Sequence, residues 1–508
     1  MSAATTVTVN GGCLPLSELP IRSFGGFATE LLALVRAGGS VIACFADQAA
    51  DNKALEIFAV LDTGQPAAQV TVLRGELADR NPSLVRHCPQ LHLFEREIAE
   101  QFGAIAKGHP WFKPLRFHRV WPGRSDAWQR DPDHWPVPGD MEFFRVEGDE
   151  VHEVAVGPVH AGVIEPGHFR FQCFGEQVLH LEISLGYQHR GIERLLADGP
   201  HPTTCGQVET MAGDTTIGHM TAHAHLVEGL AGCEPPPQAR VIRAIALELE
   251  RLANHVGDIG ALAGDVGFLP TAAFCGRLRG DYLNMTAALC GSRFGRGLIR
   301  PGGVLFDLDP ARRADIRKSL ASAAEHTRGA IELFFNAPSV LARLEGVGVV
   351  TARDAGDLGL VGIAGRASGR DCDVRRCLPT GIYRYYEHPR LVESSGDVHA
   401  RALVRQLEIE AAIAFVDQQL TILPAGEVTT PLSPLMPSAL AVGLVEGWRG
   451  RIAHVAITDS LGRFRRYKVI DPSFFNWSGL AMALRNEQIS DFPLCNKSFK
   501  LSYCGFDL

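Results

Sequence analysis

The chain has 508 residues, of which 46% are hydrophobic and 21% are charged, and these values exclude a protein dominated by disorder. A chain of this length can hold about two to four domains and a large apolar core. Its formal net charge of -8 comes from interspersed residues of both signs, so there is no basic stripe and nucleic acid is not an expected partner.

The N-terminal residues show no basic segment followed by an apolar run, and no window of about 18 uncharged apolar residues occurs. We therefore expect the chain to stay in the cytoplasm and to reach a membrane only through partner proteins. Its 12 cysteines are scattered without a Cys-x-x-Cys pair, which indicates buried thiols and predicts that this chain binds no iron–sulfur cluster.

Residues 1–120 are predicted to form a small α+β domain. The segment at 28–47 has the pattern of an amphipathic helix, a Gly-Gly stop and a strand, and the segments at 55–62 and 69–73 alternate as further strands do. These elements are too few for a large core, so the domain should be a minor part of the molecule.

The run FEREIAEQFG at 94–103, followed by GHP at 108–110, closes this first domain. On chemistry alone, Glu95, Arg96 and Glu97 indicate a solvated turn near the end of a helix. The run is also similar to the signature of the 30-kilodalton subunit of respiratory complex I, and this resemblance implies that subunit's fold for the domain.

Residues 121–145 are rich in Pro, Asp and Trp with little periodicity, which predicts a linker. A second domain is expected over 146–508, mostly helical with peripheral β-hairpins, so the overall fold class is α+β. Its predicted elements are a hairpin within 154–184, helices from Ile192 onward that are clearest at 241–268 and 396–423, and strands within 442–470.

The second domain resembles the family shared by the 49-kilodalton subunit of complex I and the large subunits of formate-hydrogenlyase-type (group 4) nickel-iron hydrogenases. Its fusion to a 30-kilodalton-like domain resembles the large subunit of formate hydrogenlyase. The motifs that carry the resemblance are GPVH at 157–160, HRGIE at 189–193, ERLANH at 250–255, RASG to DVRR at 366–376, GD to R at 396–405 and VEGWRG at 445–450.

The chain departs from the hydrogenase pattern at the metal site. In that family two cysteines and a histidine form the first metal motif, and the matching positions here are Ala212, Thr215 and His219. An Asp-Pro-Cys-x-x-Cys motif forms the second half, and here Ser473 and Asn476 stand at its cysteine positions. Because a nickel-iron centre needs soft thiolates, we expect no bound metal and no hydrogenase activity.

Complex I builds a quinone pocket where hydrogenases hold their metal, using a hairpin histidine and a tyrosine beside the lost cysteine position. The resemblance therefore implies a quinone-like acceptor here, with the iron–sulfur cluster on a partner subunit. His160 or His168 matches the hairpin histidine, and Gly213 stands at the tyrosine position. The residues expected to line the acceptor site are His160, His168, Ala212, Gly213, Thr215, His219 and Ser473.

Two charged motifs are candidates for proton transfer or coupling, each with an alternative. Glu193 resembles the proton-transfer glutamate of hydrogenases, and it could equally be half of an internal ion pair. Asp373, Arg375 and Arg376 indicate either a charged network near the acceptor site or a structural salt-bridge cluster.

His219 and His223 lie four residues apart with His225 close by, a spacing that suits either a zinc site or histidines without metal. Neither a Gly-x-Gly-x-x-Gly loop after a strand nor a Walker loop is present, so nicotinamide chemistry is expected on another subunit.

The resemblance implies a nickel-free subunit of a membrane-associated, complex I-like oxidoreductase, peripheral on the inner face of the cell membrane. Its expected partners are a small iron–sulfur subunit like the 20-kilodalton subunit of complex I and antiporter-like membrane subunits, with redox chemistry coupled to ion translocation. The alternative is a noncatalytic structural or coupling subunit of an ion-translocating complex. An active nickel-iron hydrogenase is the third and weakest alternative.

Overall fold

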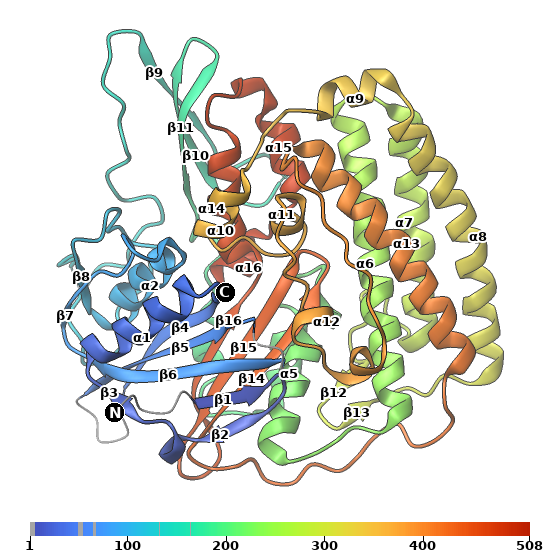
Figure 1. Ribbon diagram of the computed structural model, residues 1–508, viewed down its shortest axis with the longest axis horizontal. Helices are drawn as coiled ribbons and strands as arrows, with labels where there is room; N and C mark the ends of the chain where they lie inside the picture. Colours follow the sequence, from blue (N-terminus) through green and yellow to red (C-terminus); the bar gives the residue numbers. More distant parts are fainter. Residues whose placement is uncertain (1–5, 49–53, 65–67, 132, 163) are drawn as a thin grey trace.

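The computed structural model describes residues 6–48, 54–64, 68–131, 133–162 and 164–508. Figure 1 shows a sheet-containing N-terminal region beside a large helical body, with a hairpin that projects from one end. One continuous set of buried apolar side chains runs through both regions. The predicted α+β class is confirmed.

The N-terminal sheet has the strand order β1-β6-β5-β4, with β3 parallel to β6. Helix α1 begins after Ser23, whose hydroxyl accepts a hydrogen bond from the Gly26 amide, and it packs on the sheet through the buried Phe27 and Leu31. The predicted helix and strands are confirmed. The elements are β1 Thr6–Val9, β3 Ile21–Arg22, α1 Phe24–Arg36, β4 Ser40–Gln48, β5 Leu55–Asp62, β6 Gln69–Leu77, β7 Arg80–Pro82, α2 His92–Phe102 and β8 Ile105–Lys107.

A short N-terminal strand, β2 at Cys13–Pro15, pairs with the second sheet instead of the first. Just before it, the Asn10 amide donates to the carbonyl oxygens of Leu378 (2.8 Å) and Leu444 (3.0 Å). The two predicted domains are therefore tied together from the first strands onward.

The second sheet, β16-β15-β14-β2, lies inside the molecule, and every residue of β14 and β15 is buried. Helix α5 crosses it closely at Gly443, where a side chain would meet the Ala222 carbonyl oxygen at 2.2 Å. Strands covered on both faces read as near-continuous apolar runs, as here. The elements are β14 Ala439–Gly447, β15 Gly450–Thr458, β16 Phe464–Ile470 and α5 Thr216–Ala231.

Four long helices, α6, α7, α8 and α13, form a bundle on the far side of α5 from the N-terminal sheet (Figure 1). They are α6 Pro237–Asp265, α7 Leu269–Cys290, α8 Pro310–Phe335 and α13 Val398–Ile422. The predicted long helices at 241–268 and 396–423 are confirmed as α6 and α13.

The projecting hairpin has the strand order β11-β10-β9. The C-terminal helices return between it and the second sheet (Figure 1). The remaining elements are β9 Val151–Val156, β10 His168–Phe174, β11 Gln177–Ser184, α3 Ile192–Leu195, α4 Thr204–Glu209, β12 Ile299–Arg300, β13 Gly303–Val304, α9 Pro338–Leu344, α10 Ala352–Asp357, α11 Gly362–Ala367, α12 Val374–Cys377, α14 Ser473–Ala483, α15 Phe492–Phe499 and α16 Tyr503–Asp507.

Charged side chains buried between the two regions hold them together. Lys468 on β16 contacts Glu97 of α2 at 2.6 Å and Glu193 of α3 at 2.8 Å, and Arg116 also pairs with Glu97. The interpretation of Glu95, Arg96 and Glu97 as a solvated turn is therefore wrong, because Arg96 and Glu97 are buried.

Replacing Lys468 by Met should destabilise the protein strongly, because two buried carboxylates lose their shared cation. Breaking a buried pair costs about 3–5 kcal/mol. Urea denaturation would measure the change in the free energy of unfolding. The control is Arg317→Met, which breaks the Arg317–Asp417 pair at the surface and should cost less than about 1 kcal/mol. Equal losses in the two variants would contradict the structural role of Lys468.

Candidate functional site

Three segments meet at the positions that the sequence singled out: the loop at 210–215, the described parts of the hairpin loop at 157–162 and 164–167, and the C-terminal tail. Arg190 joins two of them, because its guanidinium donates to the carbonyl oxygens of Thr210 (3.0 Å), Met211 (2.7 Å) and Cys504 (3.3 Å). The Tyr503 amide faces a carboxylate oxygen of Glu165 in the hairpin loop at 3.4 Å. The motifs thus converge in space although these last two residues are 338 positions apart.

The Arg449 guanidinium lies in the centre of this region. It forms a two-pronged pair with the Asp214 carboxylate at 2.7 and 2.8 Å, and it donates to the Thr215 hydroxyl at 3.2 Å. It also stacks 3.9 Å from the Trp448 ring, and its Nε donates to the Lys500 carbonyl oxygen at 2.5 Å. Burial opposes ionisation of Asp214, but the Arg449 charge holds the pKa of Asp214 below its ordinary value.

Helix α6 fixes the loop that carries Asp214 and Thr215. Thr215, the N-cap residue of α5, makes no side-chain hydrogen bond to the first turn of the helix. Instead the Glu250 carboxylate accepts from the amides of Ile217 (2.7 Å) and Gly218 (3.1 Å). These two bonds satisfy N–H groups that a helix end leaves free. Burial raises the pKa of Glu250 to about 8. One turn later, the Asn254 amide donates to the Asp214 carbonyl oxygen at 3.1 Å.

The four positions at which related hydrogenases carry thiolates are buried and do not fit a nickel-iron centre. Ala212 has no donor atom, and the Thr215 hydroxyl accepts from Trp448 Nε1 at 3.1 Å. The Ser473 hydroxyl accepts from the Ser502 amide at 2.9 Å. The Asn476 amide group exchanges two 3.1 Å hydrogen bonds with the backbone of residue 361. Neutral oxygens and a methyl group cannot replace soft thiolates.

Across the described ranges, no group of three or more His, Cys, Asp or Glu side chains has the arrangement of a metal site. His219 and His223, the pair with zinc-like spacing, bond to different partners. The His219 side chain forms hydrogen bonds with His454 and Asp471. The His223 side chain forms one with the Tyr467 hydroxyl at 2.7 Å. The pair is therefore part of a polar network in the core.

Both candidate histidines of the hairpin bond to its backbone. His160 Nε2 donates to the Gly167 carbonyl oxygen at 2.8 Å, and the side chain is half-buried. His168 is 8% exposed, and its two ring nitrogens contact the Gly157 carbonyl oxygen (3.4 Å) and Arg170 Nε (3.2 Å). Burial lowers the pKa of His168. Since both nitrogens of His168 are engaged, His160 is the better candidate for ligand contact.

Gly213 lies exposed at the tip of the loop between Ala212 and Asp214. A side chain added there would meet no atom within 4 Å. The position at which the resemblance expects a tyrosine is therefore open and sterically permissive.

Glu193 lies in an internal ion pair, one of the two alternatives that the sequence left open. Its carboxylate accepts from Lys468 (2.8 Å), from Arg466 (3.1 Å) and from the Val469 amide (3.1 Å). Burial opposes its ionisation, but Lys468 and Arg466 together hold the pKa of Glu193 far below its ordinary value. The site therefore favours a carboxylate that stays ionised.

Asp373 and Arg375 belong to a fully buried ionic cluster. Asp373 contacts Arg366 at 2.9 Å and Arg375 at 2.6 Å. Glu408 pairs with Arg375 at 2.9 Å and also with Arg366, while Glu446 accepts from Arg366 at 2.9 Å. Arg376 lies outside the cluster and is exposed.

Helix α6 supplies the other half of the ionic cluster. Arg251 contacts Glu248 at 2.9 Å and Glu408 at 3.1 Å, and His255 Nε2 contacts Glu408 at 2.6 Å. The Tyr383 hydroxyl donates to Glu248 at 2.6 Å. Four carboxylates thus face three guanidinium groups, and burial together with Asp373 raises the pKa of Glu446 to about 7. The cluster has one carboxylate more than it has guanidinium groups, and protonation of Glu446 can balance this charge.

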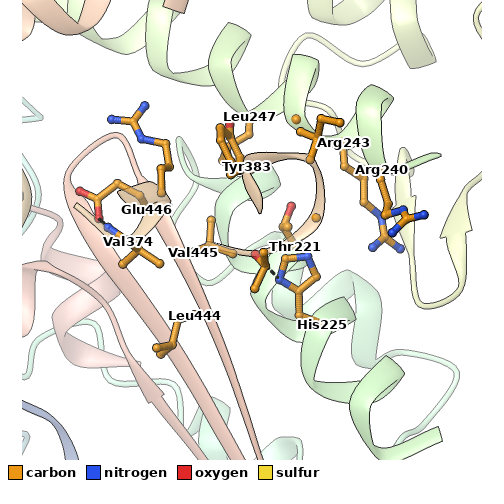
Figure 2. Close-up of a pocket in the computed structure, with 15 residues that line it drawn as sticks. Thr221, His225, Arg240, Arg243, Leu247, Val374, Tyr383, Leu444, Val445 and Glu446 are labelled. Atoms are coloured by element: carbon orange, nitrogen blue, oxygen red, sulfur yellow. Dashed lines mark hydrogen bonds between the residues drawn. The ribbon is translucent and has the colours of Figure 1, made fainter. Parts of the chain in front are cut away.

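A cavity adjoins the ionic cluster (Figure 2). Glu446 and Val374 lie on one side of it, Arg240 lies on the other, and Thr221 and His225 rise from α5 between them. A second cavity shares His225 and Arg240 and is also lined by the exposed Gly232 and Glu234. The cavity therefore reaches from the cluster toward the surface.

Sequence reasoning missed Asp214, Arg449, Glu408 and Glu446 as site residues. One signal was available for Glu446, because a lone carboxylate inside the apolar run ALAVGLVEG is unusual for a buried strand. No comparable signal marked Glu408, whose partners come from distant segments.

Replacing Glu446 by Gln should flatten the dependence of stability on pH between about pH 5 and pH 8. A carboxyl whose folded pKa is raised favours the folded state below its ordinary pKa of 4.5, and this contribution is lost as the pH rises through about 7. The loss is up to about 3 kcal/mol. Urea denaturation at several pH values measures it. The matched control is Glu410→Gln, which removes a surface partner of Arg328. An unchanged pH profile in Glu446→Gln would contradict the assignment.

Among the residues that the structure describes, every helix is too short or too polar to span a membrane.

Residues 30–132 match the family described as the 30 Kd subunit of respiratory-chain NADH dehydrogenase, and residues 265–439 match the 49 Kd subunit.

Curated relatives agree with these matches. Carbon monoxide-induced hydrogenase of Rhodospirillum rubrum is 31% identical over 68% of this chain and 95% of that protein. Formate hydrogenlyase subunit 5 of Escherichia coli (strain K12) is 30% identical over 84% of this chain and 76% of its own length. NADH-quinone oxidoreductase subunit 4 of Thermus thermophilus is 30% identical over 70% of this chain and 94% of its own length. This chain therefore belongs to the family that unites the 30- and 49-kilodalton subunits of respiratory NADH dehydrogenase with the related hydrogenase subunits.

Proposed function

We propose that this chain is the nickel-free large subunit of a membrane-associated, complex I-like oxidoreductase, in which it forms the acceptor site for a quinone-like molecule. The observation that carries the proposal is the Arg449–Asp214 pair beside Thr215, where related hydrogenases hold a metal. The electrons would come from an iron–sulfur cluster on a small partner subunit.

The side chains in this region suit an organic acceptor better than a metal. A quinone has two carbonyl oxygens that accept hydrogen bonds and need protons on reduction. The Arg449 guanidinium is a donor, and His160, whose Nε2 donates to Gly167, can also donate from Nδ1 when its ring carries a second proton. The open space at Gly213 gives room for a ligand. A fixed guanidinium would also stabilise negative charge on a reduced acceptor.

A partner subunit is needed to complete such a site. Gly213 is exposed, and Val159 at the tip of the hairpin loop is 81% exposed. The names of the relatives describe subunits, which supports a multisubunit assembly for this chain as well. We assign it a small iron–sulfur partner, antiporter-like membrane partners and a peripheral position on the cytoplasmic face of the membrane. In this assembly the ionic cluster around Glu408 would couple redox change to ion translocation.

A second candidate function is a noncatalytic structural or coupling subunit. It is favoured by the hydrogen bonds of Ser473 and Asn476, which tie former ligand positions to the backbone. It is also favoured by the backbone bond of His160, which could serve only to shape the hairpin loop.

The first experiment is to purify the native complex from detergent-solubilised membranes and to measure metal content, cluster redox signals and bound quinone in the same sample. We expect less than stoichiometric nickel, a reducible cluster and bound quinone, because the donor set offers no thiolate. Stoichiometric nickel on this chain would overturn the proposal. Absence of cluster and quinone together would leave the structural alternative.

Substitutions at Gly213 and His160 should change quinone-linked electron transfer in opposite directions. Gly213→Tyr adds a hydroxyl donor in open space, and one net hydrogen bond of about 1 kcal/mol corresponds to about a fivefold lower KM for quinone. His160→Ala should reduce turnover about fivefold or more by removing the Nδ1 donor of the doubly protonated ring. Quinone reductase assays on the assembled complex measure both.

The matched control is His201→Ala. His201 also donates from Nε2 to a backbone carbonyl, that of Ala197 at 3.0 Å, but it is exposed and precedes α4. It should leave KM and turnover unchanged. Normal kinetics in both site variants would favour the noncatalytic alternative.

A further inference from the structure

A chain of five buried side chains runs from the candidate site into the core. Asp471 Oδ2 lies 3.1 Å from His219 Nε2, and His219 Nδ1 lies 3.1 Å from His454 Nε2. His454 Nδ1 then lies 2.8 Å from the Tyr467 hydroxyl, which is 2.7 Å from His223 Nδ1. Every one of these side chains is at most 1% exposed.

We propose that Asp471, His219, His454, Tyr467 and His223 form a proton wire that supplies the acceptor site. The inference rests on the proposed function, because a reduced quinone-like acceptor consumes protons. None of the five was assigned this role by the sequence, although His219 and His223 stood out by their spacing.

The hydrogen bonds have one consistent direction when each histidine carries a single proton. Burial opposes ionisation of Asp471, but its hydrogen bond with His219 holds the pKa of Asp471 below its ordinary value, so the ionised carboxylate accepts from His219 Nε2. His219 Nδ1 then accepts from His454 Nε2, and His454 Nδ1 accepts from the Tyr467 hydroxyl. The Tyr467 oxygen in turn accepts from His223 Nδ1. Each of the three inner members is both donor and acceptor, as proton transfer along a chain requires.

The opposite direction is also available, and it describes the chain with one more proton. If His219 carries protons on both nitrogens beside the Asp471 carboxylate, its Nδ1 donates to His454, His454 donates to Tyr467, and the Tyr467 hydroxyl donates to His223. One proton that enters at His223 Nε2 converts the first arrangement into the second. Release of the His219 Nε2 proton through Asp471 then removes the extra proton from the chain. No electron moves along the chain.

The wire ends at the candidate site. The Asp471 carboxylate also accepts from the Ser473 amide at 2.8 Å, and the Arg449 charge acts on it as well. Ser473 occupies one of the four former ligand positions. Protons that arrive at Asp471 are therefore delivered beside Ser473, at the site where we place the acceptor.

The fold gives the wire its geometry. His219 and His223 are one helical turn apart on α5, so they share a face, and from this face they reach His454 and Tyr467. His454 lies on β15 and Tyr467 on β16, in two adjacent strands.

Other polar groups act on the wire from the elements around it. Glu193 of α3 acts on His454, and the half-buried Cys205 of α4 acts on Tyr467. Burial lowers the pKa of His223 to about 4 and that of His454 well below its ordinary value. An isolated cation on these two rings is therefore disfavoured, so transfer along the chain should be concerted.

The test uses the assembled complex with Tyr467→Phe, which keeps the ring and removes the only hydroxyl of the wire. We expect quinone reduction to fall at least about tenfold, with a larger solvent deuterium isotope effect, because general acid–base steps contribute factors of this size or more. The matched control is Tyr282→Phe, which also removes a fully buried hydroxyl, one that bonds to Thr327 at 3.0 Å in the bundle. Tyr282→Phe should leave the rate of quinone reduction and the solvent isotope effect unchanged. Normal turnover and isotope effect in Tyr467→Phe would overturn the proposal.

A second variant covers the case in which Tyr467→Phe fails to fold. In His223→Asn the side-chain amide nitrogen replaces Nδ1, so the hydrogen bond to Tyr467 is kept but the proton cannot pass through a second ring nitrogen. The same loss of turnover is expected in a complex that assembles normally. Full turnover in this variant would exclude His223 as the entry point of the wire.

A measurement that needs no turnover separates this inference from the proposed function. In ¹⁵N-histidine-labelled complex, solid-state NMR reports which ring nitrogen carries the proton. We expect the resting wire to show His223 protonated at Nδ1 and His454 at Nε2, and both signals should shift in Tyr467→Phe. Independent protonation of the two rings, with no response to Tyr467→Phe, would overturn the wire even if quinone reduction is found. The expected pattern in a complex without quinone reduction would keep the wire and reject only the acceptor.

Discussion

Burying charge without leaving it unpaired is the constraint on which the rest of this structure depends. An isolated ion in a protein interior costs several kcal/mol even after relaxation. Here Lys468 bridges Glu97 and Glu193 between the two predicted domains, and Arg366 bridges three acids in the second. Each bridge joins segments that are distant in sequence. The charges therefore fix which segments can meet, while the apolar core supplies the driving force.

Helix α6 shows how one element serves both the site and the ionic cluster. Glu250 and Asn254, four residues apart, face the loop that carries Asp214. Arg251 and His255, shifted by one position, face Glu408 instead. A helix places residues four apart on one face and shifts the next pair by about 100°. A change in the ionic cluster could thus reach the proposed acceptor site through a single helix.

The sequence predicted those features whose causes are local. Strand β5 was expected at 55–62 and occurs at Leu55–Asp62, because alternation over eight residues is a strong local signal. Strand β2 was missed, since three residues carry almost no periodicity and its partner β14 lies over 400 positions away. Glu97 was interpreted as solvated because its partner Lys468 is equally remote. The histidines at 219 and 223 were noticed, but their chemistry depends on His454 and Tyr467, which no spacing rule connects to them.

The two buried polar systems suit different tasks. In the ionic cluster, Glu408 contacts several cations at once, so a proton added at Glu446 changes the balance of charge without a preferred direction. In the wire each inner group has one neighbour on either side, so a proton that enters at one end can leave only at the other. Under the proposed function, the cluster would respond to the charge of a reduced acceptor and the wire would supply protons to it. Because a nickel-iron site would need thiolates where Ala212, Thr215, Ser473 and Asn476 now lie, their absence is what would allow these polar groups to act on the organic acceptor that we propose.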